Sequence, residues 1–415
     1  PVYIILMILS ILLNYFCGMD IENKSENEAK AKRSLVFAIT VNIVLLVFFK
    51  YFGFLVESTN TLFGISIPYR ELALPIGISF YTFQEISYIV DVYRGKVKAQ
   101  QSLVKYALYV SMFPQLVAGP IVCYGDIEKQ LTARKISGRK LGQGAMLFII
   151  GLSKKAVLAN TLGKIFEEIS STSASNLTVL MAWLGCITYA FQIYFDFSGY
   201  SDMAVGLGKM FGFEFCMNFN YPYIAKSITE FWRRWHISLS TWFKEYVYIP
   251  LGGNRKGLKR QILNLFIVEL LTGIWHGANW NFICWGLYYF VLLAAEKLFL
   301  LPYLKKGKVW PHFYTLFLVV VGWAMFVGND TGVSFGLLFQ KLFIPSGGVM
   351  PLYFLRNYGV LLAVSILCCT PLIEKIWNAL RKHTVTRVAA VLVLLVLSTA
   401  YVVGSTNSPF LYFNF

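Results

Sequence analysis

One of the four histidines, His276, lies inside an apolar stretch of the sequence. It stands between two glycines and two tryptophans in segment 270–282, and the flanking runs 262–271 and 283–293 are apolar enough for hydrocarbon. An ionisable side chain is costly there and usually serves a function. Imidazole is also the side chain best suited to take a proton from a hydroxyl at neutral pH. We therefore predict that His276 is a catalytic general base. The alternative is a histidine that only bonds a backbone carbonyl for packing.

A second histidine, His236, belongs to a segment rich in aromatic and basic residues. It lies beside Arg233 and one helical turn from Ser240, at the edge of the apolar face of a predicted helix. It can line the mouth of a tunnel and position a donor, or it can face lipid headgroups in an aromatic belt. The sequence leaves both interpretations open. We expect Arg233 and Ser240 to take part in binding the donor or the substrate.

Three side chains with polar groups lie within four residues of His276 in the sequence. Asn279 can orient the imidazole ring or hold a carbonyl group, and the indole N–H groups of Trp275 and Trp280 can stabilise an oxyanion. We predict that all three line the site, where they bind the donor or the substrate.

Carboxylates at membrane depth are further candidates. Asp196 follows a long aromatic run at the end of a predicted crossing. It can pair with Arg233 or Arg234 and hold the site together, or it can face only water; we favour the ion pair. Gln84 and Glu85 lie inside another apolar run, where hydrogen bonding from helix to helix is the alternative to a functional role.

No motif for a metal or a permanently bound cofactor accompanies these residues. The sequence has no glycine-rich phosphate loop, no nucleophile elbow and no metal-ligand spacing. Its seven cysteines lie mostly inside apolar runs. The basic stretch 255–260 has the right sign for a phosphate-bearing cytoplasmic donor, although topology alone also places basic residues there.

The composition is that of a polytopic membrane protein. Hydrophobic residues make up 57% of the 415 residues and charged residues only 14%, which does not fit a soluble globular domain. The net charge of +16 would suggest nucleic-acid binding in a soluble chain. Here the basic residues cluster in short loops between apolar runs, as cytoplasmic loops do. We expect a lipid bilayer as the surroundings and no nucleic-acid partner.

The elements that position the histidines are predicted to be membrane-crossing helices. A crossing needs roughly 20 mostly apolar residues, which gives about ten crossings in a single all-α transmembrane bundle over residues 1–415. Pro1 already lies inside an apolar segment, so we expect that an N-terminal piece precedes it. The His276 segment forms the bend of a two-crossing hairpin over 262–298. The other predicted crossings are 1–17, 35–56, 72–92, 145–166, 177–197, 314–327, 353–372 and 388–403.

Two segments do not fit a simple crossing. Residues 103–122 lie between basic loops and are interrupted by Pro114 and Pro120. A broken, re-entrant segment is expected there, because irregular backbone at membrane depth must be buried in protein or face water. Residues 217–260 are predicted to be an interfacial or cytoplasmic helical region. In it, apolar residues recur at helical spacing over 228–246, which predicts an amphipathic helix in or near the membrane plane.

Four motifs stand out along the chain: DFSGYSDM at 196–203, FWRRWHISLS at 231–240, IPLGGNR at 249–255 and GIWHGANW at 273–280. In this order and spacing they resemble the motifs of the membrane-bound O-acyltransferase superfamily and match its bacterial alginate O-acetyltransferase branch. VAGPI at 117–121 and NSPF at 407–410 are similar as well.

The resemblance implies a compact bundle with a thin, tunnelled centre. In it, His276 corresponds to the catalytic histidine of the family and His236 to its second motif histidine. It also implies transfer of an acyl group from a cytoplasmic thioester, either an acyl-CoA or an acyl carrier. For this branch the expected donor is acetyl-CoA. The expected acceptor is an extracytoplasmic hydroxyl on a polysaccharide or on an acetyltransferase-type partner protein.

We therefore predict a multi-pass O-acyltransferase of the bacterial cell membrane, in which the donor passes His236 and the acceptor meets it at His276. D-alanyl transfer to teichoic acid is the related alternative, and the IPLGGNR motif favours the polysaccharide branch. A transporter or flippase for a lipid-linked sugar is an alternative from another class, because intramembrane polar residues also mark translocation paths. A non-catalytic membrane anchor is the third.

Overall fold

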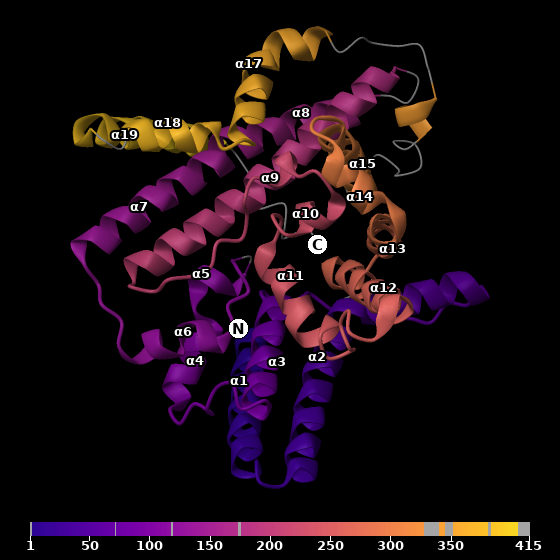
Figure 1. The fold of residues 1–415 in the computed structure, drawn as a ribbon, viewed down its shortest axis with the longest axis vertical. Helices are drawn as coiled ribbons and strands as arrows, with labels where there is room; N and C mark the ends of the chain where they lie inside the picture. Colours follow the sequence, from indigo (N-terminus) through magenta and orange to yellow (C-terminus); the bar gives the residue numbers. More distant parts are fainter. Residues whose placement is uncertain are drawn as a thin grey trace.

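The computed structural model is built from helices (Figure 1). It describes residues 2–70, 72–117, 119–172, 176–327, 340–344, 352–380 and 383–405, so the segment 407–410 lies outside the described residues. Every element in these ranges is helical, which confirms the predicted all-α class. The elements are α1 (Val2–Asn23), α2 (Glu28–Phe63), α3 (Ile78–Tyr93), α4 (Leu103–Ser111), α5 (Phe113–Leu116), α6 (Tyr124–Thr132), α7 (Gly138–Ser153), η1 (Lys154–Ala159), α8 (Asn160–Ser170), α9 (Val179–Met210), η2 (Pro222–Ile224), α10 (Ile228–Trp232), α11 (Ile237–Phe243), η3 (Lys244–Tyr248), α12 (Gly257–His276), α13 (Trp280–Ala295), η4 (Glu296–Leu300), α14 (Leu301–Lys306), α15 (Trp310–Phe326), α17 (Leu352–Cys368), α18 (Leu372–Leu380) and α19 (Thr384–Val403).

Six helical segments in the described ranges are long and apolar enough to cross a membrane, and the bent pair α17–α18 makes a seventh if it is counted as one span. The prediction of about ten crossings is therefore too high. Three predicted crossings fall outside this set. The α3 helix begins only after Pro75 and has 16 residues, α15 has 17 residues, and α12 carries Lys259, Arg260 and Glu269.

The segment 103–122 is broken as predicted. The α4 and α5 helices are separated at Met112, whose extended backbone ends one helix and precedes the other. Pro114 occupies the first turn of α5, where a missing amide hydrogen is tolerated. The Tyr109 hydroxyl donates to the Val122 carbonyl at 3.0 Å and ties the end of this segment back to α4.

The predicted continuous amphipathic helix over 228–246 is wrong. The chain forms α10, breaks at residues 233–236 and continues as α11 and then the π-helical turn η3. Its apolar side chains pack inside the protein rather than on a membrane surface: Phe231, Trp235 and Leu239 are all buried. The break has a local cause at His236, which is described below.

Three clusters of buried apolar side chains hold the helices together. One joins α1, α2, α3 and α4, and a second joins α8, α9, α10, α13 and α15. In Figure 1 the first group occupies the lower part of the molecule and the second the upper part, with α11 and α12 between them. The third cluster joins α3, α11 and α12 through Phe83, Trp242 and Trp275. The two motif histidines lie where these three clusters meet.

Candidate functional site

His276 lies at the bend of the hairpin that the sequence predicts. It is the last residue of α12, and α13 begins at Trp280. The two helices pack closely where Gly273 faces Gly286, because a Cβ added to Gly273 would lie 3.2 Å from the Cα of Gly286. A larger side chain at either position would push the helices apart. The glycine contact therefore fixes the position of His276.

The His276 side chain is buried among aromatic rings and is 6% exposed. It packs edge-on against Trp285 and Phe326, with ring centroids 5.0 and 5.2 Å away. The Trp275 ring lies near both motif histidines, 5.1 Å from the His276 ring and 6.0 Å from the His236 ring. The structure thus brings the two predicted histidines, from different helices, to one tryptophan.

His236 has a left-handed backbone conformation, with φ of 45°. A non-glycine residue pays of order 1–3 kcal/mol for such a conformation, which is found preferentially at functional sites. The conformation interrupts the helix between α10 and α11 and turns the side chain into the protein, where it is 1% exposed. The alternative in which His236 faces lipid headgroups is therefore wrong.

Asn218 holds His236 and determines which ring nitrogen carries the hydrogen. Its Oδ1 accepts hydrogen bonds from the backbone N–H and the hydroxyl of Ser238, at 3.1 and 2.9 Å. His236 Nδ1 lies 3.2 Å from the same oxygen, so Nδ1 donates and Nε2 keeps the lone pair. Burial lowers the pKa of His236 to about 3, so the ring is neutral at neutral pH and Nε2 can accept a hydrogen bond.

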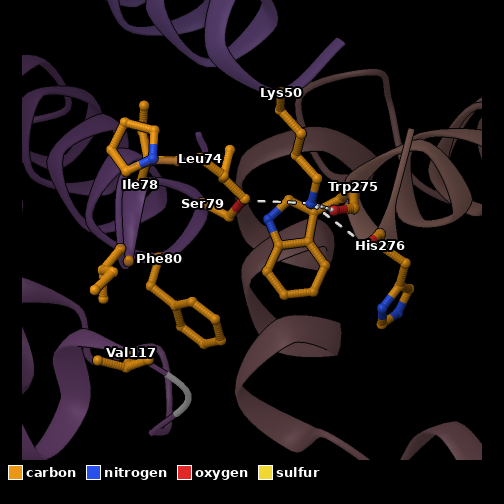
Figure 2. A pocket seen from close by; sticks show the side chains of 11 residues that line it. Lys50, Leu74, Ile78, Ser79, Phe80, Val117, Trp275 and His276 are labelled. Carbon is orange, nitrogen blue, oxygen red and sulfur yellow. Dashed lines mark hydrogen bonds between the residues drawn. The ribbon is translucent and has the colours of Figure 1, made fainter. Parts of the chain in front are cut away.

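Lys50 is the functional candidate that sequence reasoning missed. Its ammonium donates to the backbone carbonyls of Trp275 at 2.5 Å and of His276 at 3.4 Å (Figure 2). The hydroxyl of Tyr51 donates to the Ile274 carbonyl at 2.5 Å. A hydrogen-bond donor at the C-terminal end of a helix is favourable, because the last carbonyls have no partner within the helix. The sequence did indicate this residue, because Lys50 is the single lysine inside the apolar run 35–56 of α2.

Two of the predicted oxyanion and orienting groups have other surroundings. Trp280 is 60% exposed and its ring packs against Phe54 at 5.6 Å, so its predicted place beside His276 is wrong. Asn279 caps α13, because its side-chain oxygen accepts from the backbone N–H of Asn281 at 3.0 Å. Of the predicted indole groups, only Trp275 lies at the histidines.

The predicted pairing of Asp196 with an arginine is wrong. The α9 helix runs on to Met210, so Asp196 lies within it rather than at its end. Its carboxylate forms a buried ion pair with Lys155 of η1. Arg234 instead pairs with Glu230 one turn away, at 2.9 Å. Asp196 therefore joins α9 to η1 and does not reach the histidines through an arginine.

For Glu85, the alternative of hydrogen bonding from helix to helix is the one that the structure supports. It is fully buried in α3, and its carboxylate accepts a hydrogen bond from the Ser10 hydroxyl of α1 at 2.6 Å. The contact holds two helices of the lower cluster together and does not reach the histidines.

Two cavities lie along α12. The first, of about 130 Å³, is at the C-terminal end of the helix and is lined by Lys50, Ser79, Trp275 and His276 (Figure 2). The second, of about 590 Å³, runs along the part of α12 between residues 265 and 272. The cavities therefore approach the same helix at different heights, one at His276 and one nearer its basic beginning.

The second cavity is lined by two of the three candidate residues of the α10–α11 segment, and His236 is not among its lining residues. Arg233 and Ser240 both line it, together with the cations Lys244 and Lys297 and the buried carboxylate Glu269. The Ser240 hydroxyl donates to a backbone carbonyl of α10. Three cations against one carboxylate favour a ligand that carries negative charge. Among the described residues, no group of histidine, cysteine and carboxylate side chains is arranged to hold a metal ion.

The helices that are long and apolar enough to cross a membrane define a multi-pass membrane protein, with two buried histidines beside one tryptophan in its interior. A profile of the membrane-bound O-acyltransferase family matches residues 98–335, which is more than half of the chain. The chain belongs to this family.

Several named relatives refine this result. The chain is 44% identical to a probable alginate O-acetylase of Pseudomonas putida over 340 residues, covering 79% of this chain and 69% of the relative. It is 38% identical to a peptidoglycan O-acetyltransferase of Helicobacter pylori, with 71% and 61% covered. It is 30% identical to a teichoic acid D-alanyltransferase of Bacillus subtilis, with 56% and 61% covered. The chain spans about two thirds of the length of the alginate O-acetylases that it matches.

Proposed function

We propose that this protein is an O-acetyltransferase of the bacterial cell membrane, and that it passes an acetyl group from a cytoplasmic thioester to an extracytoplasmic hydroxyl. The observation that carries the proposal is the approach of His236 and His276 to one tryptophan, Trp275. One cavity is lined by Trp275 and His276, and a second is lined by Ile237, the residue that follows His236. An enzyme that joins substrates from two sides of a membrane needs two entrances to one reacting centre. Membership of the acyltransferase family and the names of the relatives support the reaction type.

The donor in this proposal enters through the second cavity. Its volume of about 590 Å³ suits an extended thioester arm, and Arg233, Lys244 and Lys297 offer positive charge to the phosphates of acetyl-CoA or to an acyl-carrier thioester. The beginning of α12 overlaps the basic stretch 255–260, which the positive-inside rule assigns to the cytoplasm. No cofactor stays bound in this scheme, because the thioester is consumed as a substrate.

The acceptor in this proposal reaches His276 through the first cavity, on the extracytoplasmic side. His276 removes the proton from the acceptor hydroxyl as its oxygen attacks the thioester carbonyl. The new C–O bond forms, the C–S bond breaks, and the leaving thiolate takes the proton back from His276. The neutral Nε2 of His236 can accept a hydrogen bond from the donor arm and position it. The indole N–H of Trp275 is the group that we assign to the oxyanion.

The acceptor is a polysaccharide or a partner protein that relays the acetyl group. Relatives at 44% and 38% identity are named for alginate and for peptidoglycan, and both of these polymers carry hydroxyl groups. D-alanyl transfer to teichoic acid is the second candidate, because a D-alanyltransferase is also among the relatives, at 30% identity.

The purified protein is expected to release coenzyme A from acetyl-CoA and to acetylate one of these polymers. The measurement is mass spectrometry of polymers incubated with the protein and isotopically labelled acetyl-CoA. It is paired with comparison of the surface polymers of cells with and without the gene. D-alanyl label in place of acetyl would favour the second candidate. A protein that moves a lipid-linked sugar and cleaves no thioester would overturn the proposal.

Lys50→Met is expected to lower the rate of acetyl transfer about 10- to 100-fold, because a small displacement of a catalytic group has effects of that size. The substitution keeps the length of the side chain but removes the donor to the carbonyls of Trp275 and His276. Tyr51→Phe removes only the neighbouring hydrogen bond and is the matched control, with a smaller loss expected. A wild-type rate for Lys50→Met would show that the lysine does not position His276.

A further inference from the structure

A groove between α7 and α19 is separate from both cavities of the proposed site. It encloses about 530 Å³. The two helices that line it lie side by side at one edge of the molecule (Figure 1). Two arginines, Arg139 of α7 and Arg387 of α19, line it near the N-terminal ends of these helices. Neither guanidinium has an ion-pair or hydrogen-bond partner in the part of the chain that the structure describes.

The two helices run in the same direction and diverge toward the arginines. Farther along both helices, the Ser153 and Ser398 hydroxyls are hydrogen-bonded at 2.9 Å, so the helices touch there. Toward the other end, a Cβ added to Gly138 or to Gly142 would meet no atom within 4 Å. The open space is thus at the charged end, and the contact is at the apolar end.

Apart from Gln143, the rest of the groove is lined by glycine and apolar residues. Its lining below the arginines includes Met146 and Ile149 of α7 and Val388 and Leu392 of α19. Val388 is 48% exposed and Leu392 is 54% exposed on a helix that lies almost wholly outside the protein core. A ligand that fits must therefore carry negative charge at one end and hydrocarbon at the other.

We propose that this groove binds an anionic phospholipid, with its phosphate between Arg139 and Arg387 and an acyl chain along α7 and α19. Guanidinium groups bind phosphate oxygens in a bidentate manner, and the first turns of two helices add positive potential at the same place. Basic pockets between transmembrane helices at the cytoplasmic surface are suited to anionic headgroups. The lipid fills the gap and couples the peripheral α19 to α7.

The test uses the full-length chain in mild detergent, with native mass spectrometry of bound lipid. Phosphatidylglycerol is expected to be retained in preference to phosphatidylethanolamine with the same acyl chains. In the double variant Arg139→Gln/Arg387→Gln, binding should weaken about 30-fold, since two cations at the membrane surface contribute that much. The matched control is Lys32→Gln/Arg33→Gln, which removes two exposed cations from the N-terminal end of α2 and should bind as the wild type.

Gly142→Leu tests the apolar part of the groove independently. The new side chain enters open space and leaves both arginines in place, so it should displace the acyl chain and lower lipid retention without loss of the fold. This variant decides the question if the double arginine variant cannot be purified. Equal retention of the two lipids, or unchanged phosphatidylglycerol binding by Gly142→Leu, would overturn the proposal. Equal thermal stabilisation by inorganic phosphate alone would also overturn it, because the ligand would then be a free anion.

Discussion

His276→Gln is expected to lower acetyl transfer about 10²- to 10⁴-fold, which is the usual contribution of a general base. Glutamine is close in size to histidine and can fill the space among Trp285 and Phe326, but its amide cannot take a proton from a hydroxyl. The carbonyl of residue 276 remains available to Lys50, so the end of α12 keeps its contact. The measurement is the initial rate of transfer of labelled acetyl to the acceptor, at saturating donor.

The control for this prediction is His312→Gln in α15, a half-buried histidine that lines neither cavity at the site. It should transfer acetyl at the wild-type rate. Thermal unfolding of both variants would show whether the fold is intact. If purified His276→Gln kept more than about a tenth of the wild-type rate, the assignment of His276 as general base would be wrong, whatever the behaviour of the control.

Lys155→Met is expected to destabilise the protein by about 3–5 kcal/mol, because it leaves the carboxylate of Asp196 buried without its cation. Both partners are nearly inaccessible: the Lys155 side chain is 10% exposed and that of Asp196 is 3% exposed. The neighbouring pair, Lys154 with Asp202 at 2.6 Å, has a lysine that is 27% exposed. Lys154→Met should therefore cost less and is the matched control.

The measurement is the midpoint of thermal unfolding in detergent, together with the yield of folded protein. The double variant Lys155→Met/Asp196→Leu should recover much of the loss, because it removes the buried charge along with its partner. If the double variant were no more stable than Lys155→Met, the unpaired carboxylate of Asp196 would not be the cause of the lost stability. A Lys155→Met protein as stable as the wild type would rule out a stabilising ion pair.

The errors in the sequence-based predictions have physical explanations. A helical pattern of apolar residues over 228–246 is compatible with a continuous helix, and nothing in it reveals the left-handed backbone of His236. That conformation depends on Asn218, which is distant in sequence and bonds Ser238 on the far side of the break. The excess in predicted crossings came from apolar segments such as α3, which is buried by other helices rather than by lipid.

The sequence by itself determined the class of protein and the helical hairpin at His276, and it singled out His236 and His276 as candidate site residues. These depend on local properties: the length of apolar runs, the placement of basic loops and the order of short motifs. Only the tertiary structure decided that Trp275 packs near His236, that Lys50 holds the end of α12 and that Asp196 pairs with Lys155. Each of these is a contact between segments far apart in the chain, and a pattern along one helix does not specify which side chain of another helix will meet it.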